Sequence, residues 1–467
     1  MNKKKTPGGK KFNLPATDAR VVAFQVLGAF RQGRFPDEAL EKLGARLDRR
    51  DRALASALVH GVLRHKTRLE WMIGRHLSKP GKKLDPDVLT ILCLGAFQLT
   101  DLTRIPARAA VDESVNLAKA FCPPWAGGLV NAVLRQAARE EKPADPWAEN
   151  LGEDEKLALV FSHPLWLVRR WLEELGPEET SRLLAANNEQ PPLTIRTNTP
   201  RTDRNALADL LTGRAAEIEE TPFSPAGLRL CGSAGAVADL PGFSEGFFAV
   251  QDEAAQVIGF LAKPRPGEKV LDACAGRGGK SFHLAAQNPQ GTVIGLDVDF
   301  SRLAQTRAEQ NRLGLGNLCF VQGDLAENAP FPEKYFDLVL VDAPCSNLGV
   351  IRRRPDVKWS KSPDEPARKA AIQKKLLTAA SRLVKPGGRL VYAVCTLTPE
   401  ETLGVTDDFW MNNLEFGLKP VSLYLPEQAL PLACPDGVLR AWPHRSRTDG
   451  FFAAVFERKP QKPPDFK

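Results

Sequence analysis

The stretch that most constrains the fold is residues 338–341, a short unbroken run of apolar side chains. Such a run is typical of a strand buried on both faces of a parallel sheet. The run ends at Asp342, and Pro344 favours an exit from the sheet because proline cannot donate to a strand ladder. A carboxylate and the Cys345 thiol therefore follow a strand end, where open α/β sheets bind ligands. An acidic turn residue followed by a small buried cysteine would give the same peptide.

Four further segments repeat this pattern of a short strand followed by a loop, at residues 269–274, 292–296, 318–322 and 389–394. The residues at or just after their ends include Asp272, Asp297, Asp324 and Cys395. Because the carboxyl ends of parallel strands meet at one edge of a sheet, we expect these side chains to lie together. Chance could explain any one of these residues, but it explains the whole series poorly. The sequence predicts an α/β domain with a ligand site at one sheet edge.

A glycine-rich loop joins the first of these strands to a helix that is expected to begin near Ser281. The loop consists of Cys274, Ala275, Gly276, Arg277, Gly278, Gly279 and Lys280. Its glycines let the backbone turn and let a ligand approach closely. The spacing is neither that of a dinucleotide-binding loop nor that of a Walker loop, which disfavours a nicotinamide oxidoreductase. Asp297 is placed to accept hydrogen bonds from the ribose of a nucleoside cofactor, and Asp324 to meet an adenine amino group.

The first third of the chain is expected to be all-α, with no acid–base constellation, so that binding is its expected role. Helical patterns begin at Asp18 and continue over residues 36–45, 51–64, 67–77, 86–99, 107–120 and 128–138. The following region mixes helices at residues 162–171 and 204–211 with strands near 193–198, 228–231 and 247–250. This mixture predicts a small α+β module.

Composition narrows the function classes. The chain has 64 Lys and Arg against 56 Asp and Glu, and the net charge of +8 suits a polyanionic partner such as RNA. The eight cysteines form no Cys-x-x-Cys pair and no ligand-spaced group with the six histidines, so no metal is expected. Without an apolar run long enough for a membrane span, and without a secretion signal, we expect a cytoplasmic protein.

Several runs carry a resemblance to known proteins. Residues 58–64, 91–98, 105–115 and 130–135 resemble the RNA-binding helical domain of the antitermination factor NusB. The strand-end series resembles class I S-adenosylmethionine methyltransferases, and a cysteine after strand four and another after strand five resemble the RNA cytosine-5 branch. Together with its NusB-like N-terminal domain, this series identifies the chain as a member of the RsmB/Sun/Fmu family of 16S ribosomal RNA (cytosine-5-)-methyltransferases.

The resemblance implies a domain organisation. It consists of a basic flexible arm at residues 1–17, a NusB-like domain at 18–145, a small RNA-facing α+β domain at 150–246, a methyltransferase domain with a Rossmann-like sheet at 247–458, and a tail at 459–467. The implied partner is small-subunit ribosomal RNA, and we expect a monomer.

The resemblance also implies the site residues. Cys395 is the nucleophile that adds to carbon 6 of the cytosine, and Cys345 assists release of the methylated RNA. Asp342 contacts the cytosine and also the cofactor, S-adenosyl-L-methionine. The cofactor is held by the loop 274–280 together with Asp297, Asp324 and Asp342.

The sequence departs from the family pattern in three places. In the loop, Gly276, Arg277 and Ser281 replace alanine, proline and threonine. Val394 precedes the nucleophile where the family has threonine, and Thr402 replaces an asparagine. The last change puts in doubt the hydrogen-bond support behind the nucleophile.

Two alternatives for the function stay open. The first is the same chemistry on transfer RNA or large-subunit RNA. The second is a non-catalytic RNA chaperone or antitermination factor with a relic cofactor pocket.

A basic loop at residues 351–359 is expected to hold RNA, with its cations on phosphates and Trp359 stacked on a base. A surface loop with Trp359 packed inward is the alternative. Arg445 and Arg447 are further candidates for the same RNA-facing surface.

Overall fold

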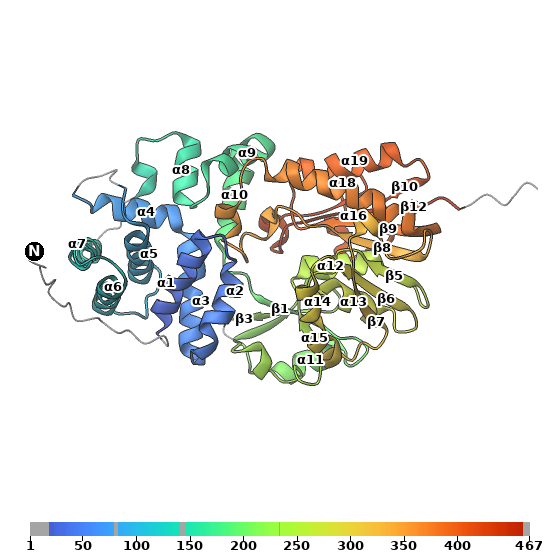
Figure 1. Ribbon diagram of the computed structural model, residues 1–467, viewed down its shortest axis with the longest axis horizontal. Helices are drawn as coiled ribbons and strands as arrows, with labels where there is room; N and C mark the ends of the chain where they lie inside the picture. Colours follow the sequence, from blue (N-terminus) through green and yellow to red (C-terminus); the bar gives the residue numbers. More distant parts are fainter. Residues whose placement is uncertain (1–17, 79–82, 141–144, 233, 461–467) are drawn as a thin grey trace, which may run out of the picture. The chain divides into compact units, whose positions relative to one another are not determined.

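The computed structural model describes residues 18–78, 83–140, 145–232 and 234–460 (Figure 1). The chain divides into two compact units. The first runs to Asn188 and includes Arg354–Ser360, and the second comprises Glu189–Arg353 and the chain from Lys361 onward. The predicted basic arm lies outside the described residues, and so do residues 461–467 of the predicted tail. Among the described helices, none is long and apolar enough to cross a membrane.

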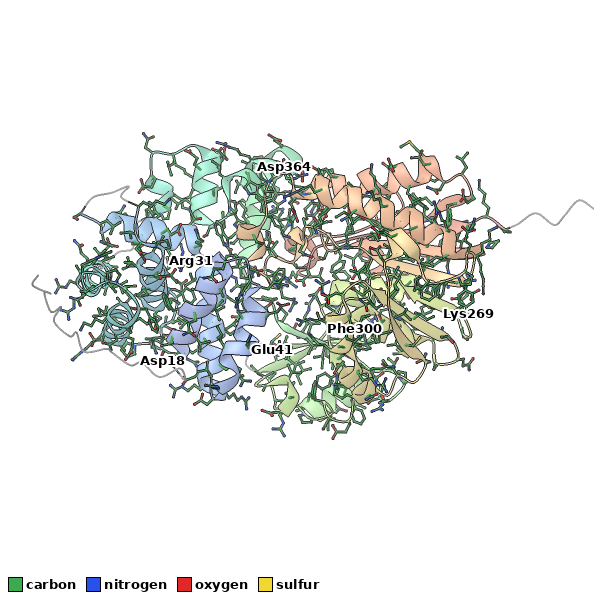
Figure 2. The ribbon with its side chains drawn as sticks, viewed as in Figure 1. Asp18, Arg31, Glu41, Lys269, Phe300 and Asp364 are labelled. Carbon is green, nitrogen blue, oxygen red and sulfur yellow. The ribbon has the colours of Figure 1, made fainter. Side chains whose placement is uncertain are left out.

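The first unit is helical, as predicted. Its helices are α1 (Ala19–Arg31), α2 (Pro36–Leu43), α3 (Arg49–Arg64), α4 (Lys66–Arg75), α5 (Pro86–Thr100), α6 (Ala107–Phe121), α7 (Ala126–Ala137), α8 (Glu153–Val160), α9 (Leu165–Leu175) and α10 (Pro177–Asn188). Asp18 caps α1 by accepting from the amides of Arg20 and Val21, and Asp18 and Arg31 mark the two ends of the helix (Figure 2).

Part of the helical prediction was wrong. Ser162 and His163 precede α9 instead of forming its first turn, because Ser162 adopts a left-handed φ of 53°. Helices α8 and α10 had no predicted counterpart. In α8 the apolar residues do not follow a clear helical period, so the sequence pattern carried little signal there.

Helix α5 lies at the centre of the first unit, where it contacts α1, α3, α4, α6 and α7. It is apolar nearly all round, which is typical of a helix without a solvent-facing side. The approach of α3 is close enough that a Cβ built on Gly61 would lie 2.0 Å from Cζ of the Phe97 ring. Only glycine permits this packing distance between the two helices.

The second unit begins with a small antiparallel sheet in the order β2-β3-β1-β4. Its elements are β1 (Leu193–Thr197), α11 (Arg204–Leu211), β2 (Glu217–Glu220), β3 (Gly227–Cys231) and β4 (Phe248–Val250). Side chains of the sheet and α11, among them Ile195, Leu207 and Phe248, form its own core. Strand β2 was not predicted because its sequence, Glu-Ile-Glu-Glu, is mostly charged and exposed.

The larger sheet of the second unit contains the five predicted parallel strands. They are β5 (Lys269–Asp272), β6 (Thr292–Asp297), β7 (Leu318–Gln322), β8 (Phe336–Asp342) and β9 (Val384–Val394), in the order β7-β6-β5-β8-β9. Beyond β9 the sheet continues with the antiparallel strands β12 (Phe451–Arg458) and β10 (Phe416–Lys419), and β11 (Leu439–Ala441) also pairs with β12. The prediction of an α/β domain with a Rossmann-like sheet is confirmed.

Alternate residues of β8 face opposite sides of this sheet. Leu338 and Leu340 pack in the core that α12 (Glu253–Ala262) and α13 (Gly279–Gln287) cover. Val339 and Val341 pack in the core under α18 (Glu365–Leu383) and α19 (Leu403–Asn412), on the other face (Figure 1). Burial on both faces explains the unbroken apolar run. Shorter helices are α14 (Phe300–Ala304), α15 (Thr306–Leu313), α16 (Leu325–Asn328), α17 (Val357–Ser360) and α20 (Pro443–Ser446).

Gly61→Ala is predicted to destabilise the helical unit by about 1–3 kcal/mol, because its methyl group would overlap the Phe97 ring. Gly74→Ala in α4 is the matched control, since nothing lies within 4 Å of a Cβ built there. It is expected to stabilise by up to about 1 kcal/mol through helix propensity. Thermal unfolding followed by circular dichroism should separate the two variants. Equal shifts of the melting temperature would contradict the packing argument.

Candidate active site

Two thiols meet at the edge of the sheet where β8 and β9 end. The Sγ atoms of Cys345 and Cys395 lie 3.3 Å apart. Oδ1 of Asn347 accepts from both, at 2.9 Å from Sγ of Cys395 and at 3.5 Å from Sγ of Cys345. Asn347 has a left-handed φ of 63°, a conformation that asparagine adopts more readily than most residues. The sequence singled out both cysteines but not Asn347, which aligns them.

The environment holds Cys395 as a neutral thiol in the resting protein. Its pKa is raised well above its usual range, first by the hydrogen bond with Cys345 and next by burial. The nearby charge of Asp342 acts in the same direction, whereas Lys280 opposes it. Formation of a thiolate therefore requires that a proton acceptor or a bound substrate change this balance.

Lys280 and Asp342 form an ion pair beside the thiols, with 2.6 Å between Nζ and Oδ2. Burial would lower the pKa of Lys280, but the attraction of Asp342 and its hydrogen bond outweigh burial and raise it. The ammonium group also lies 5.0 Å from the centre of the Phe451 ring. Lys280 thus brings a permanent positive charge to the predicted catalytic carboxylate.

A buried carboxylate supports the loop that carries Cys345. Oε2 of Glu401 accepts from the amide of Ser346 at 2.9 Å and from Nε2 of Gln373 at 2.9 Å. The hydroxyl of Thr398 donates to Oε1 at 3.0 Å. Burial raises the pKa of Glu401, although these hydrogen bonds oppose that shift. Glu401 therefore provides hydrogen-bond support at this point, and Thr402 instead donates to the carbonyl of Thr398.

The two cysteine loops are also joined directly. The hydroxyl of Ser346 donates to that of Thr396 at 3.0 Å, and the amide of Gly349 donates to the carbonyl of Cys395 at 3.0 Å. The amide of Gly450 donates in turn to the carbonyl of Gly349 at 2.7 Å. A Cβ built on Gly349 would lie 2.3 Å from the oxygen of Gly450, so the backbones pack in direct contact. Three loops are thereby held in one arrangement.

The glycine-rich loop turns tightly at the end of β5. Gly276 and Gly278 have φ values of 56° and 80°, which glycine adopts without strain. The amide of Gly276 donates to Oδ2 of Asp297 at 2.8 Å, which ties the loop to the end of β6. Cys274 and Ala275 lie between Asp272 and this turn, and the exposed side chain of Arg277 points away from the core. Asp324 lies at the end of β7, where it caps α16 by accepting from the amide of Ala326.

This sheet edge has a carboxylate and open space that fit a cofactor with an ammonium group. Oδ1 of Asp272 is buried without a hydrogen-bond partner, while the hydroxyl of Ser281 donates to Oδ2 at 2.6 Å. No atom lies within 4 Å of a Cβ built on Gly276 or Gly279, so the loop leaves open space. Among the described residues there is no group of three or more His, Cys, Asp or Glu that could hold a metal.

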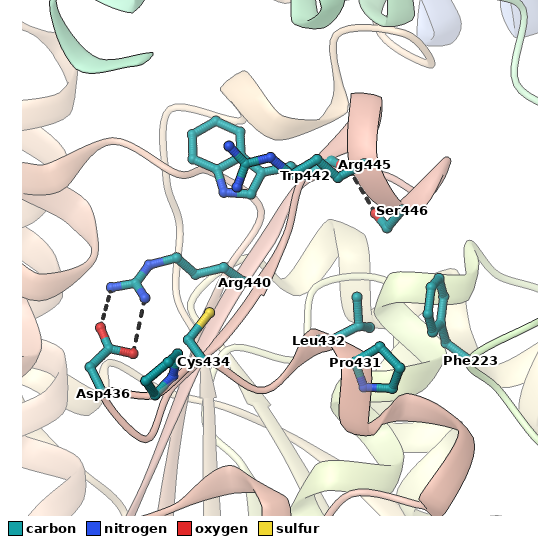
Figure 3. A pocket seen from close by; sticks show the side chains of 10 residues that line it. Phe223, Pro431, Leu432, Cys434, Asp436, Arg440, Trp442, Arg445 and Ser446 are labelled. Atoms are coloured by element: carbon teal, nitrogen blue, oxygen red, sulfur yellow. Dashed lines mark hydrogen bonds and ion pairs between the residues drawn. The ribbon is translucent and has the colours of Figure 1, made fainter. Parts of the chain in front are cut away.

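A separate cavity of about 530 Å³ lies beside β11 and α20. Figure 3 shows the ion pair of Arg440 and Asp436 in it, with Trp442, Arg445 and Phe223 on its other walls. Of these residues the sequence had indicated only Arg445.

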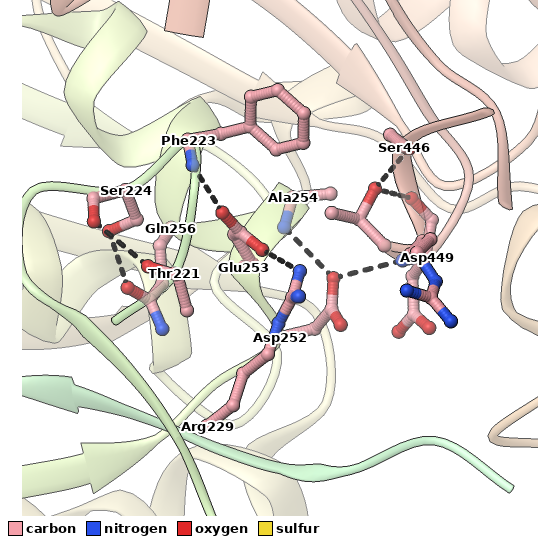
Figure 4. Close-up of polar contacts among 12 residues, drawn as sticks. Thr221, Phe223, Ser224, Arg229, Asp252, Glu253, Ala254, Gln256, Ser446 and Asp449 are labelled. Atoms are coloured by element: carbon pink, nitrogen blue, oxygen red, sulfur yellow. Dashed lines mark hydrogen bonds and ion pairs between the residues drawn. The ribbon is translucent and has the colours of Figure 1, made fainter. Parts of the chain in front are cut away.

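A buried network of charges joins the loop after Cys345 to the hairpin before β12. Arg352 donates to Oδ1 of Asp449 at 2.8 Å and to Oδ2 of Asp252 at 3.3 Å, and each of these three side chains is at most 6% exposed. Arg353 also pairs with both carboxylates. Figure 4 shows Asp252 and Asp449 side by side, with the neighbouring pair of Arg229 and Glu253.

The expectation that the whole basic loop at residues 351–359 faces RNA was wrong. Arg352 is buried in the charge network, and Lys358 is fully buried, donating to the carbonyl of Arg64 and to Oδ1 of Asn188. Nε1 of Trp359 donates to the carbonyl of Leu63, so the indole packs inward. Arg352 pairs with buried carboxylates, whereas Lys358 and Trp359 donate to backbone carbonyls at the end of a helix. The sequence pattern does not distinguish these roles from RNA binding.

Comparison with known proteins identifies the family. Three family models match the chain. They are the 16S rRNA methyltransferase RsmB/F at residues 260–457, the NusB family at 17–139, and the RsmF/B-like ferredoxin-like domain at 163–236. The probable ribosomal RNA small subunit methyltransferase B of Synechocystis sp. is 35% identical over 94% of this chain and 99% of its own length. That of Bacillus subtilis is 34% identical over 96% and 100%.

The chain belongs to the family of ribosomal RNA small subunit methyltransferase B. The resemblance predicted from the sequence is confirmed, and the cofactor of this methyltransferase family is S-adenosylmethionine. Among solved structures, "Crystal Structure of PH0851" matches with a TM-score of 0.77 and 26% identity, over 96% of this chain and 100% of that chain. A methyltransferase homolog protein from Pyrococcus horikoshii matches with a TM-score of 0.56 and 25% identity, over 66% and 99%.

Affinity for S-adenosylmethionine is predicted to fall in acid. Burial raises the pKa of Asp272 to about 6, although the hydrogen bond from Ser281 opposes the shift. The carboxylate that would pair with the cofactor's ammonium group therefore becomes neutral as the pH drops below this value. Since only the ionised fraction binds, the Kd should rise about tenfold per pH unit below it. Calorimetry across the pH range tests this, and Asp272→Asn should bind weakly with no such dependence. An unchanged Kd at acid pH in the native protein would contradict the assignment.

Arg352→Ala is predicted to destabilise the second unit by about 3–5 kcal/mol, because it leaves Asp252 and Asp449 buried with only Arg353 between them. Arg368→Ala is the control, since that arginine is 65% exposed in its pair with Glu365 and its loss should cost less than about 1 kcal/mol. Thermal unfolding of both variants gives the comparison. Similar melting temperatures would show that the network contributes little.

Proposed function

We propose that the protein transfers a methyl group from S-adenosylmethionine to carbon 5 of a cytosine in 16S ribosomal RNA, through a covalent adduct with Cys395. The observation that carries this proposal is the pair of thiols 3.3 Å apart, beside the ion pair of Lys280 and Asp342. Carbon 5 of cytosine is too weak a nucleophile to accept a methyl group unaided. A thiolate that adds to carbon 6 makes carbon 5 electron-rich.

The proposed addition step uses Asp342 as a proton carrier. The thiol proton of Cys395 passes to the Asp342 carboxylate and from there to N3 of the base, while the bond between Sγ and C6 forms. The electrons of the C5–C6 double bond then lie between C4 and C5. Lys280, whose pKa stays high because of Asp342, stabilises the negative charge during this transfer. Neutral Cys395 at rest is consistent with deprotonation that accompanies binding of the base.

S-adenosylmethionine supplies the methyl group from its sulfonium sulfur when it is bound. In our proposal the loop 274–280, Asp272, Asp297, Asp324 and Asp342 hold it at the sheet edge. After methyl transfer, Cys345 first loses its thiol proton to solvent and then, as the thiolate, accepts the proton from carbon 5. The C5–C6 double bond re-forms as Sγ of Cys395 leaves, and the proton on N3 returns through Asp342 to Cys395. The position of Cys345 next to Cys395 supports this role in release.

We further propose how the domains share the work. Residues 18–145 would bind RNA through exposed residues such as Arg104, Arg108 and Arg135, residues 150–246 would face the RNA, and residues 247–458 would carry out the methyl transfer. A monomer and a cytoplasmic location stay predictions.

Bisulfite sequencing of RNA from a deletion strain tests the substrate, because the lost mark names its own position. A mark lost from transfer RNA or large-subunit RNA would favour the alternative substrates. Tight binding of S-adenosylmethionine without turnover on any RNA would favour a non-catalytic chaperone.

Cys395→Ala is predicted to reduce methyl transfer to the background of the assay, since no thiolate remains to activate carbon 5. Cys345→Ala should instead accumulate an enzyme–RNA adduct that survives denaturing electrophoresis, because addition proceeds while release is blocked. Cys122→Ala, in the helical unit, is the matched control and should retain activity. A fully active Cys395→Ala enzyme would overturn the proposed mechanism.

A further inference from the structure

One end of the cavity beside β11 and α20, where Trp442 lies, is level in the sheet with the strand end that carries Cys395. In the antiparallel pairing of β12, Phe452 lies opposite Val394, the residue before Cys395, and Phe451 lies opposite Ala441. Trp442 directly follows Ala441. With neighbouring strands about 5 Å apart, the wall of the cavity is about 10 Å across the sheet from Cys395. The ring of Phe451, in contact with Lys280, lies in the strand between them.

The walls of the cavity combine an aromatic surface with charges of both signs. The half-buried indole of Trp442 has the guanidinium of Arg445 5.8 Å from its centre. Across the cavity, the two nitrogens of Arg440 donate to Oδ1 and Oδ2 of Asp436, at 3.0 and 2.7 Å (Figure 3). Phe223, from the loop between β2 and β3, completes the lining. Proteins that bind single-stranded nucleic acid use such pairings of aromatic rings and arginines.

We propose that this cavity binds one unpaired nucleotide of the substrate RNA next to the target cytosine, with its base stacked on Trp442. The proposal rests on the proposed function, because a cytosine taken out of its stack leaves its neighbours exposed. The volume of about 530 Å³ is within the range of small-molecule sites and large enough for a nucleotide.

The polar groups of the cavity give the bound nucleotide a defined orientation. Arg445 lies beside the indole, where it meets the phosphate or the outer face of the stacked base. The carboxylate oxygens of Asp436 keep lone pairs beyond those used by Arg440, so this pair offers both donors and acceptors to the edge of a base. The cavity therefore holds a base by stacking and selects among bases by its polar edge.

The test asks which single nucleotide of the RNA interacts with Trp442. The substrate is a 16S ribosomal RNA fragment that carries the cytosine found by bisulfite sequencing, with an abasic nucleotide placed in turn at each position that flanks it. Transfer of labelled methyl groups gives the KM and kcat for RNA. Trp442→Ala should raise KM roughly 5- to 150-fold, as expected for loss of one stacked base, with a smaller change in kcat. One abasic position should raise KM similarly in the native enzyme and have no further effect in Trp442→Ala.

Further variants separate stacking from misfolding. Trp442→Phe should return KM most of the way to the native value. Trp442→Ala and Trp442→Phe should both bind S-adenosylmethionine with the native Kd. Arg445→Gln, at an exposed position, should raise KM and show the same position-specific coupling. Trp410→Ala removes an exposed indole on α19 and should show no coupling to any abasic position.

Either of two results would overturn the subsite. In the first, every abasic position raises the KM of Trp442→Ala by the same factor as it raises the KM of the native enzyme. In the second, KM is unchanged in both Trp442→Ala and Arg445→Gln. That failure differs from failure of the proposed function. An active Cys395→Ala enzyme would refute the covalent mechanism whatever the KM measurements show.

Discussion

The parallel pairing of β8 with β9 is the interaction on which the rest of the site depends. Asp342 lies opposite Ala393 in this register, and the amide of Ala343 continues the ladder to the carbonyl of Ala393 at 2.9 Å. Because parallel strands end at the same edge, Cys345 and Cys395 emerge together although 50 residues separate them. Each strand is apolar on both faces, so its register is set by two packed cores at once.

The edge created by this pairing is polar and buried, which is costly unless each charge has a partner. Asp342 has Lys280, Glu401 has a backbone amide and two side-chain donors, and Arg352 lies between two aspartates. These contacts explain why the loops that carry Cys345 and Cys395 can be both irregular in backbone and closely defined in position. They also explain why the loop after Cys345 carries so many basic side chains, most of which contact other groups of the protein.

Sequence reasoning recovered the strand ends and the reactive side chains at them, because apolar period and turn signals are local. Asp342, Cys345 and Cys395 each follow an apolar strand, and the glycine-rich loop follows another. Asn347 was missed because its role depends on a left-handed backbone and on two sulfur atoms from different strands. Trp359 was misread because an exposed indole and a buried one have the same neighbours in sequence.

The sequence by itself determined the five parallel strands, the helical first third and the order in which reactive side chains follow strand ends. These features depend on the alternation and length of apolar runs, which any chain displays before it folds. Tertiary structure alone decided which charges are buried against one another, how Glu401 supports the loop of Cys345, and where the cavity beside Trp442 opens. Such features arise from pairs of residues distant along the chain, and burial, not residue type, decides whether a charge meets solvent, RNA or another charge.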